Sequence, residues 1–235
     1  MKITFIAHSG VFIEFEKCCI LIDYYRGEVP SIPEGKKLFV MASHGHGDHF
    51  NPAIMKNFGG DREYILSEDI KSRIGVKDSE SLKITFVKAR QEYTFSDGNG
   101  GELILRTLFS TDEGVAFLIK YAGKTVYHAG DLNLWIWEDN EAQYDRWMRE
   151  TYSAEIGKLK GEKIDLAFLP LDGRMGKRGF CGIEEFVKIN RVEKICPIHL
   201  FTGFDFIDKF LNDSASIGCR EKILRVDRED YKFEI

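Results

Sequence analysis

Residues 38–43, Leu-Phe-Val-Met-Ala-Ser, form an apolar run that constrains the fold more than any other segment of the chain. A half-buried strand alternates apolar and polar side chains, whereas a run without alternation is typical of a strand that is covered on both faces. Asn51 and Pro52 follow soon after, and Asn at the N-cap with Pro at the first helical position indicates the start of a helix. We therefore expect a sheet with covered faces and helices close behind its strands.

The other strand and helix signals fall into two groups along the chain. Apolar and β-branched runs between turn residues predict strands at 2–6, 11–15, 18–23, 82–87, 92–95, 102–109, 115–121, 124–129, 164–169, 194–198, 222–226 and 231–234. Apolar residues at three- and four-residue spacing, together with capping signals, predict helices at 52–58, 67–74, 140–160, 182–190 and 204–211. Strands followed by helices, twice over, suit two packed sheets with helices outside. No Pro/Gly/Ser-rich linker divides the chain, so we expect one domain over residues 1–235.

The composition narrows the classes of partner and compartment. Lys and Arg number 33 and Asp and Glu 38, so the net charge is −5 at pH 7, whereas a general nucleic-acid binder usually has a basic surface. No apolar run approaches the length of a membrane span. We therefore expect neither a nucleic-acid nor a membrane partner. The 5 cysteines include no Cys-x-x-Cys pair, and residues 1–7 resemble a strand rather than a signal peptide. These features favour reduced thiols in a cytoplasmic protein.

Three of the 6 histidines fall within residues 44–49, His-Gly-His-Gly-Asp-His, directly after the apolar run. Imidazole and carboxylate groups are good ligands for Zn²⁺ and similar ions. In an extended segment His44 and His46 face the same side, and the two glycines then let the backbone turn sharply. Asp48 and His49 can therefore point at a second position. The pattern predicts a metal site with two pairs of ligands; the alternative is a polar loop that happens to be rich in histidine.

The 44–49 motif resembles the signature of the metallo-β-lactamase superfamily, and further landmarks of that family follow in order. Asp23 closes an apolar run, like the family's early aspartate. Asp131 resembles the carboxylate that bridges the two metals, and His199 is similar to the last histidine ligand. Residues 7–10 and 127–131 look most like the branch related to ascorbate-6-phosphate lactonase. The resemblance implies an α/β fold, an αββα sandwich of two mixed sheets with helices on the outer faces and metals at one edge.

The resemblance also implies the cofactor and its ligands. Two divalent cations, Zn²⁺ or alternatively Mn²⁺, would be bound by His44, His46, Asp48, His49, Asp131 and His199. The family usually supplies one more histidine before the bridging aspartate, but residues 108–114, Leu-Phe-Ser-Thr-Asp-Glu-Gly, contain none. Either the His44/His46 position lacks a ligand, or Asp112 or Ser110 fills the gap. We expect unequal positions, a firm one at Asp48/His49/His199 and a weaker one at His44/His46.

Other polar residues carry weaker signals. Asp23 is interpreted as a partner that fixes a histidine tautomer, with a simple strand-end turn as the alternative. His128 is interpreted as structural or as a support for the ligands, and the sequence does not place His8. A charged loop after the strand at 164–169 either meets an anionic substrate or faces solvent. Its charged residues are Asp172, Arg174, Lys177 and Arg178.

Together these features predict a metal-dependent hydrolase that acts on a small-molecule substrate. A hydroxide that bridges the two cations would attack a small, anionic ester, lactone or phosphoester. Asp48 is the predicted catalytic residue, because it binds metal and can orient the nucleophile. The missing histidine motivates an alternative, a non-catalytic metal-binding or regulatory protein with a degenerate first site. The sequence leaves the oligomeric state open.

Overall fold

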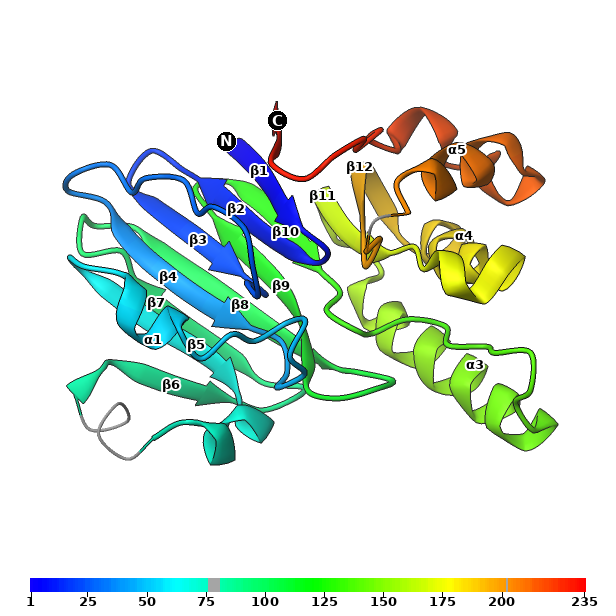
Figure 1. Cartoon of the computed structure of the whole chain (residues 1–235), viewed down its shortest axis with the longest axis horizontal. Helices are drawn as coiled ribbons and strands as arrows, with labels where there is room; N and C mark the ends of the chain where they lie inside the picture. Colours follow the sequence, from blue (N-terminus) through cyan, green and yellow to red (C-terminus); the bar gives the residue numbers. More distant parts are fainter. Residues whose placement is uncertain (76–80, 202) are drawn as a thin grey trace.

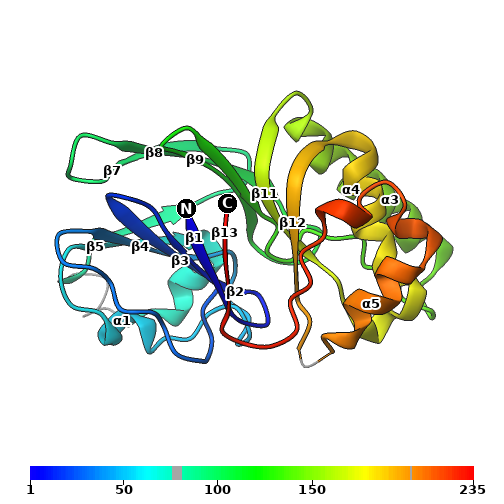
Figure 2. The same cartoon turned by 90° about the horizontal axis from the view of Figure 1, so that it is seen from above.

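In the computed structural model, which describes residues 1–75, 81–201 and 203–235, two β-sheets lie face to face with helices outside them (Figures 1 and 2). The αββα sandwich predicted from the sequence is confirmed. The two chain ends lie side by side, because the first strand pairs with the last one. In the described residues, no helix is both long enough and apolar enough to cross a bilayer.

The first sheet has seven strands in the order β13-β1-β2-β3-β4-β5-β6. They are β1 (Lys2–Ala7), β2 (Gly10–Glu14), β3 (Cys18–Ile22), β4 (Lys37–Ala42), β5 (Arg62–Ser67), β6 (Ile84–Val87) and β13 (Tyr231–Glu234). Strands β3 to β6 are parallel, and β1 and β2 join them by antiparallel pairing. The apolar run forms β4 in the interior of this sheet, and every one of its residues is buried. The expected coverage of both faces is therefore confirmed.

The second sheet has six strands in the order β12-β11-β10-β9-β8-β7. They are β7 (Glu92–Ser96), β8 (Glu102–Phe109), β9 (Val115–Tyr121), β10 (Lys124–His128), β11 (Lys163–Pro170) and β12 (Arg191–Ile198). Strands β7 to β10 are antiparallel, and β10 to β12 are parallel. Three helices lie outside this sheet, α3 (Ala142–Ile156), α4 (Cys181–Ile189) and α5 (Asp205–Asn212), and the short α1 (Ile54–Asn57) covers the first sheet (Figure 2).

Successive side chains of β4 point to opposite faces of the first sheet, and each face has its own hydrophobic core. Phe39 and Met41 join the main core between the sheets, whereas Val40 packs outward with Ile54 of α1. Successive strand residues point to opposite faces, so both cores need apolar residues and the run shows no alternation. Cys18 and Cys19 divide in the same way, one in each core. The two thiols are therefore free and pack in opposite cores.

Several predicted elements differ from the structure. Residues 222–226 form no strand, and only Ile223 makes an isolated bridge, to Ile195. The segment Glu68–Arg73 is a 3-10 helix rather than an α-helix. Strand β5 was not predicted, because it begins with the charged residues Arg62 and Glu63 and so lacks an apolar run of the usual length. Its buried Glu63 accepts hydrogen bonds from Lys37 Nζ and Lys83 Nζ, both at 2.7 Å, so a charged strand residue is paired inside the fold.

Fewer of the apolar residues of α3 are buried than their spacing in the sequence suggests. Met148, Tyr152 and Ile156 are buried, as expected. Tyr144 and Trp147, in contrast, remain 43% and 44% exposed. The two rings instead pack against each other, with centroids 5.6 Å apart.

Candidate metal centre

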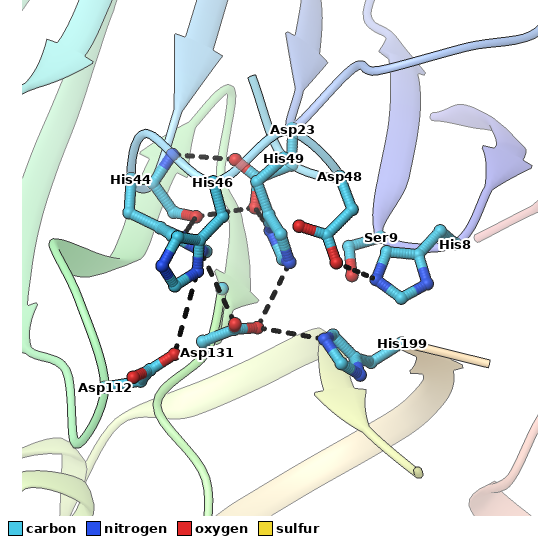
Figure 3. Close-up of polar contacts among 12 residues, drawn as sticks. His8, Ser9, Asp23, His44, His46, Asp48, His49, Asp112, Asp131 and His199 are labelled. Carbon is cyan, nitrogen blue, oxygen red and sulfur yellow. Dashed lines mark hydrogen bonds and ion pairs between the residues drawn. The ribbon is translucent and has the colours of Figure 1, made fainter. Parts of the chain in front are cut away.

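The six predicted metal ligands converge at one edge of the sandwich (Figure 3). They follow the C-terminal ends of strands: the 44–49 segment follows β4, Asp131 follows β10, and His199 follows β12. Together with an atom of His8, their ligand atoms form two groups, in each of which all atoms lie within 4.8 Å of one another. One group contains His44, His46 and Asp131, and the other contains His8, Asp48, His49 and His199.

Asp131 belongs to the first group and also faces the second, each with a different carboxylate oxygen. Its Oδ2 is 3.4 Å from His44 Nε2, whereas its Oδ1 is 3.2 Å from His49 Nε2 and 3.6 Å from His199 Nε2. Burial alone would raise the pKa of this carboxyl, but the neighbouring imidazoles of His49 and His199 hold the pKa well below its usual range. Asp131 is therefore an ionised carboxylate placed to serve both positions.

The residues present fit a divalent cation. His49 Nε2 and Asp131 Oδ1 are buried and face each other at 3.2 Å, but neither makes a hydrogen bond of good geometry among the described residues. Such atoms are costly unless something binds them. Tetrahedral Zn²⁺ with bonds of 2.0–2.1 Å keeps its ligand atoms about 3.3 Å apart. The distances of 3.2 and 3.6 Å around Asp131 Oδ1 are of this size.

The His44/His46 position differs from the other in its exposure and donors. His44 Nε2 and His46 Nδ1 face each other at 3.0 Å. Two carboxylates approach His46 from the turn where the family's further histidine is missing: Asp112 Oδ2 lies 3.8 Å from Nδ1 and Glu113 Oε2 lies 3.4 Å from Nε2. The side chains of His46, Asp112 and Glu113 are all 40–48% exposed. This position is therefore open to solvent and richer in oxygen donors.

Ser110 is used in a different way from Asp112. It is buried, and its Oγ accepts the backbone N–H of Asp112 at 3.2 Å. The serine thus shapes the turn that presents the aspartate. Of the two candidates for the missing ligand, the geometry favours Asp112.

Asp23 sets the tautomers of two histidines from behind the centre. One oxygen accepts Ser43 N–H at 2.7 Å, and the other accepts Ser43 Oγ–H at 2.7 Å and His49 Nδ1–H at 2.9 Å. Since the Ser43 hydroxyl donates to Asp23, its oxygen accepts the Nδ1–H of His44 at 3.0 Å. In both rings Nε2, the atom that is free to bind a cation, then faces Asp131. The geometry supports the tautomer-fixing role predicted for Asp23.

Asp172 does the same for His199, which the sequence reasoning missed. The loop at 173–180 is a kinked 3-10 helix, and Asp172 before it is fully buried. Its Oδ2 accepts His199 Nδ1–H at 3.1 Å. Burial raises the pKa of this carboxyl, but the hydrogen bonds from His199 and Arg174 hold the pKa well below its usual range. Asp172 is therefore not part of a charged substrate-facing surface.

His8 is the other residue that the sequence did not place. It follows β1 with a φ of 56°, and Asp23 and His199 have similar φ values of 50° and 62°. Left-handed backbone at non-glycine residues often marks functional sites. His8 Nδ1 accepts the N–H of Phe201 at 3.3 Å, so its proton lies on Nε2, 3.3 Å from Asp48 Oδ2. Burial lowers the pKa of His8 to about 4, so the ring is neutral. His8 Nε2 makes no hydrogen bond of good geometry among the described residues, and we interpret His8 as a residue that can donate to Asp48 from this position.

His128 and Gly130 position the turn that carries Asp131. His128 Nε2 donates to Ser9 O at 3.0 Å, and its Nδ1 accepts Gly130 N–H at 3.1 Å, which agrees with the structural role predicted for it. Gly130 has a φ of +53°, and a Cβ there would lie 2.7 Å from Cβ and Oγ of Ser43. The turn that carries Asp131 and the strand before the 44–49 motif thus meet through a glycine contact that other residues would disturb.

The comparisons with known proteins agree with this geometry. Residues 2–146 match the family model described as the beta-lactamase superfamily domain. A UPF0173 metal-dependent hydrolase from Pelotomaculum thermopropionicum is 28% identical over 222 residues, 86% of this chain and 85% of that protein. The fold resembles Igni18, a metallo hydrolase from Ignicoccus hospitalis, with a TM-score of 0.70, 20% identity and coverage of 100% and 98%. It also resembles the metallo-beta-lactamase fold protein YhfI from Bacillus subtilis, with a TM-score of 0.60, 15% identity and 99% of each chain covered.

The family model covers more than half of the chain, and the motif that it matches lies at the edge where the two sheets bring the histidines and aspartates together. The chain therefore belongs to the metallo-β-lactamase superfamily.

Proposed function

We propose that this metal-dependent hydrolase cleaves a small, anionic ester, lactone or phosphoester at two divalent cations, Zn²⁺ or alternatively Mn²⁺. The observation that carries the proposal is Asp131, a buried carboxylate whose two oxygens face two separate groups of ligand atoms. Bound cations would lower the pKa of a water toward neutrality and polarise the substrate. The five cysteines are free and four of them are buried, which supports a reducing, cytoplasmic location.

Side chains around the metal positions would orient the attacking water and the metal ligands. Asp48 is a third exposed at the open side of the centre, and the hydrogen bond from His8 is the main reason that the pKa of its carboxyl lies well below its usual range. The ionised carboxylate can accept a proton or a hydrogen bond from an attacking water. The neutral His8 ring holds that carboxylate in place. Asp23 and Asp172 keep the ligand lone pairs of His49 and His199 directed at Asp131.

The two positions are proposed to bind metal unequally. Asp48, His49, His199 and Asp131 form a complete and mostly buried set, with an imidazole braced by Asp23 and another by Asp172. The other position depends on the half-exposed His46 and Asp112. Its ion is therefore expected to exchange faster.

The test combines metal content with turnover. We expect about two equivalents of metal per chain and hydrolysis of one class among lactones, phosphate esters and thioesters. His46→Ala and Asp131→Ala should each abolish bound metal or hydrolysis, and Asp139→Ala, which alters an exposed turn residue, serves as the control. Full activity in either site variant would end this mechanism. One tight equivalent without turnover on any substrate would favour the alternative, a metal-binding or regulatory protein.

A further inference from the structure

We propose that Arg174 is the specificity-determining residue of the centre and that it binds a carboxylate or phosphate group of the substrate, away from the bond that is cleaved. The inference rests on the proposed function and adds the class of substrate. The starting observation is that the positively charged side chain of Arg174 lies at the edge of a centre made of histidines and carboxylates.

Aromatic rings place the Arg174 guanidinium beside the ligands. Its Cζ lies 4.5 Å from the ring centroid of Phe201 and 5.7 Å from that of Trp137. The Phe201 ring is 4.1 Å from the His8 ring and 5.3 Å from the His199 ring. Arg174 is therefore separated from two members of the centre by one aromatic ring.

Asp172 fixes the orientation of the same guanidinium. Arg174 Nε lies 3.0 Å from Oδ1 and 2.9 Å from Oδ2, and Nη2 donates to Oδ2 at 2.5 Å. This carboxylate also accepts from His199 Nδ1, so Arg174 and a ligand share one anchor. The anchored edge leaves Nη1 with no hydrogen-bond partner in residues 1–75, 81–201 and 203–235. The side chain is 56% exposed, so the free edge can be reached from solvent.

The other two cationic side chains of this loop, Lys177 and Arg178, are not fixed beside the ligands. Lys177 Nζ pairs with Asp213 Oδ2 at 2.9 Å and is 86% exposed, and Arg178 is exposed without an ion pair in the described parts of the chain. Arg174 alone in this loop combines a held orientation with proximity to the ligands. A guanidinium with a fixed plane and a free N–H edge suits the oxygens of a carboxylate or phosphate.

The test measures anion binding to the metal-loaded protein, so it does not depend on turnover. Calorimetry with succinate and with inorganic phosphate gives the Kd in the wild type, Arg174→Gln, Arg174→Lys and the matched control Arg178→Gln. We expect Arg174→Gln to weaken the binding of one or both anions about 10- to 100-fold, with partial recovery in Arg174→Lys. Arg178→Gln should bind as the wild type does. Metal content is measured for every variant.

The outcomes separate this inference from the proposed function. The two probes distinguish a carboxylate substrate from a phosphate substrate, since the preferred anion should lose more affinity. Binding in Arg174→Gln within twofold of the wild type would mean that the anions bind the metals only, and would overturn the inference. So would a wild type that binds neither anion, or an equal loss in Arg178→Gln.

A pair of esters gives a second readout. Arg174→Gln should raise KM for 4-nitrophenyl hemisuccinate and leave KM for the neutral 4-nitrophenyl butyrate unchanged. Equal effects on both esters would indicate only a structural role through Asp172. If neither ester nor any other substrate is hydrolysed while Arg174→Gln still weakens anion binding, the hydrolase proposal fails and the role of Arg174 stands.

Discussion

Replacing Asp23 with asparagine tests how the fold prepares both metal positions. In the wild type, Asp23 Oδ2 accepts hydrogen bonds from Ser43 Oγ and His49 Nδ1, at 2.7 and 2.9 Å. The amide oxygen of asparagine can keep the bond from Ser43 N–H, but its NH₂ group then faces His49 Nδ1. His49 Nδ1 can accept from this NH₂ group only without its own proton, so the neutral ring then keeps its proton on Nε2, which is the atom that points at Asp131. The ligand lone pair is lost at that atom.

The structure sets the size of the effect. One hydrogen bond to a charged acceptor, worth about 1.5–3 kcal/mol, is exchanged for a neutral one worth about 0.5–1.5 kcal/mol. We therefore expect Asp23→Asn to lower the free energy of unfolding of the metal-free protein by about 1–2 kcal/mol. Loss of a group that orients a metal ligand typically costs about 10- to 100-fold in metal affinity, or about 1.4–2.7 kcal/mol. Ser43 also hydrogen-bonds to His44, so a change at Asp23 alters the orientation of both rings. The affinity of both metal positions should therefore fall.

Two measurements check this reasoning. Urea unfolding of the metal-free protein gives the change in stability, and competition with a chelator gives the affinity of each equivalent. Asp139→Asn, at an exposed turn, is the matched control and should leave both values unchanged. An Asp23→Asn protein that binds both metals within twofold of the wild type would refute the tautomer argument. Loss of stability without loss of affinity would assign Asp23 to folding alone.

Three further results are expected. Asp112→Ala should weaken only the more labile metal equivalent, by about tenfold, when the equivalents are titrated against a chelator, and equal loss of both would contradict this. Gly130→Ala should lower the free energy of unfolding in urea by about 1–3 kcal/mol because of its positive φ and its contact with Ser43, whereas Gly157→Ala, with open space around it, should not. At pH 7 metal binding should release at least the one proton of His49, counted by calorimetry in buffers of different ionisation enthalpy, and a bound water that ionises adds to this count. Burial lowers the pKa of His49, but the carboxylates around it hold that pKa well above its ordinary value, so the metal-free ring carries a proton on Nε2 that the cation displaces.

The sequence predicted those strands well whose own residues reflect how each strand is buried or where it ends. β4 is apolar throughout because both of its faces are buried, and the strands from β7 to β10 are separated by clear turns. β5 escaped prediction because Glu63 is compensated by Lys37 of β4 and by Lys83, directly before β6, and pairing of this kind is visible only in three dimensions. The false strand at 222–226 has the right composition, but only Ile223 makes a β-bridge.

The same distinction separates the ligands from the residues that orient them. The 44–49 motif is dense enough in histidine to be recognised locally, and Asp131 and His199 were found through the resemblance to a family. His8 and Asp172 have no such local signal, because each is a single polar residue in a turn. Their roles come from bonds to Asp48 and His199, across 40 and 27 positions of the chain.

A topological rule would nevertheless have placed them. His8, Asp23, His44, Asp131, Asp172 and His199 all lie within three residues of the C-terminal end of a strand, namely β1, β3, β4, β10, β11 and β12. Within each sheet these strands point the same way, so their carboxyl ends share one edge, where irregular backbone can carry polar groups without breaking a ladder. A polar residue directly after such a strand is therefore a better candidate than an equally polar residue elsewhere. Asp112 satisfies the same rule after β8, as expected of a residue proposed for the place of the missing histidine.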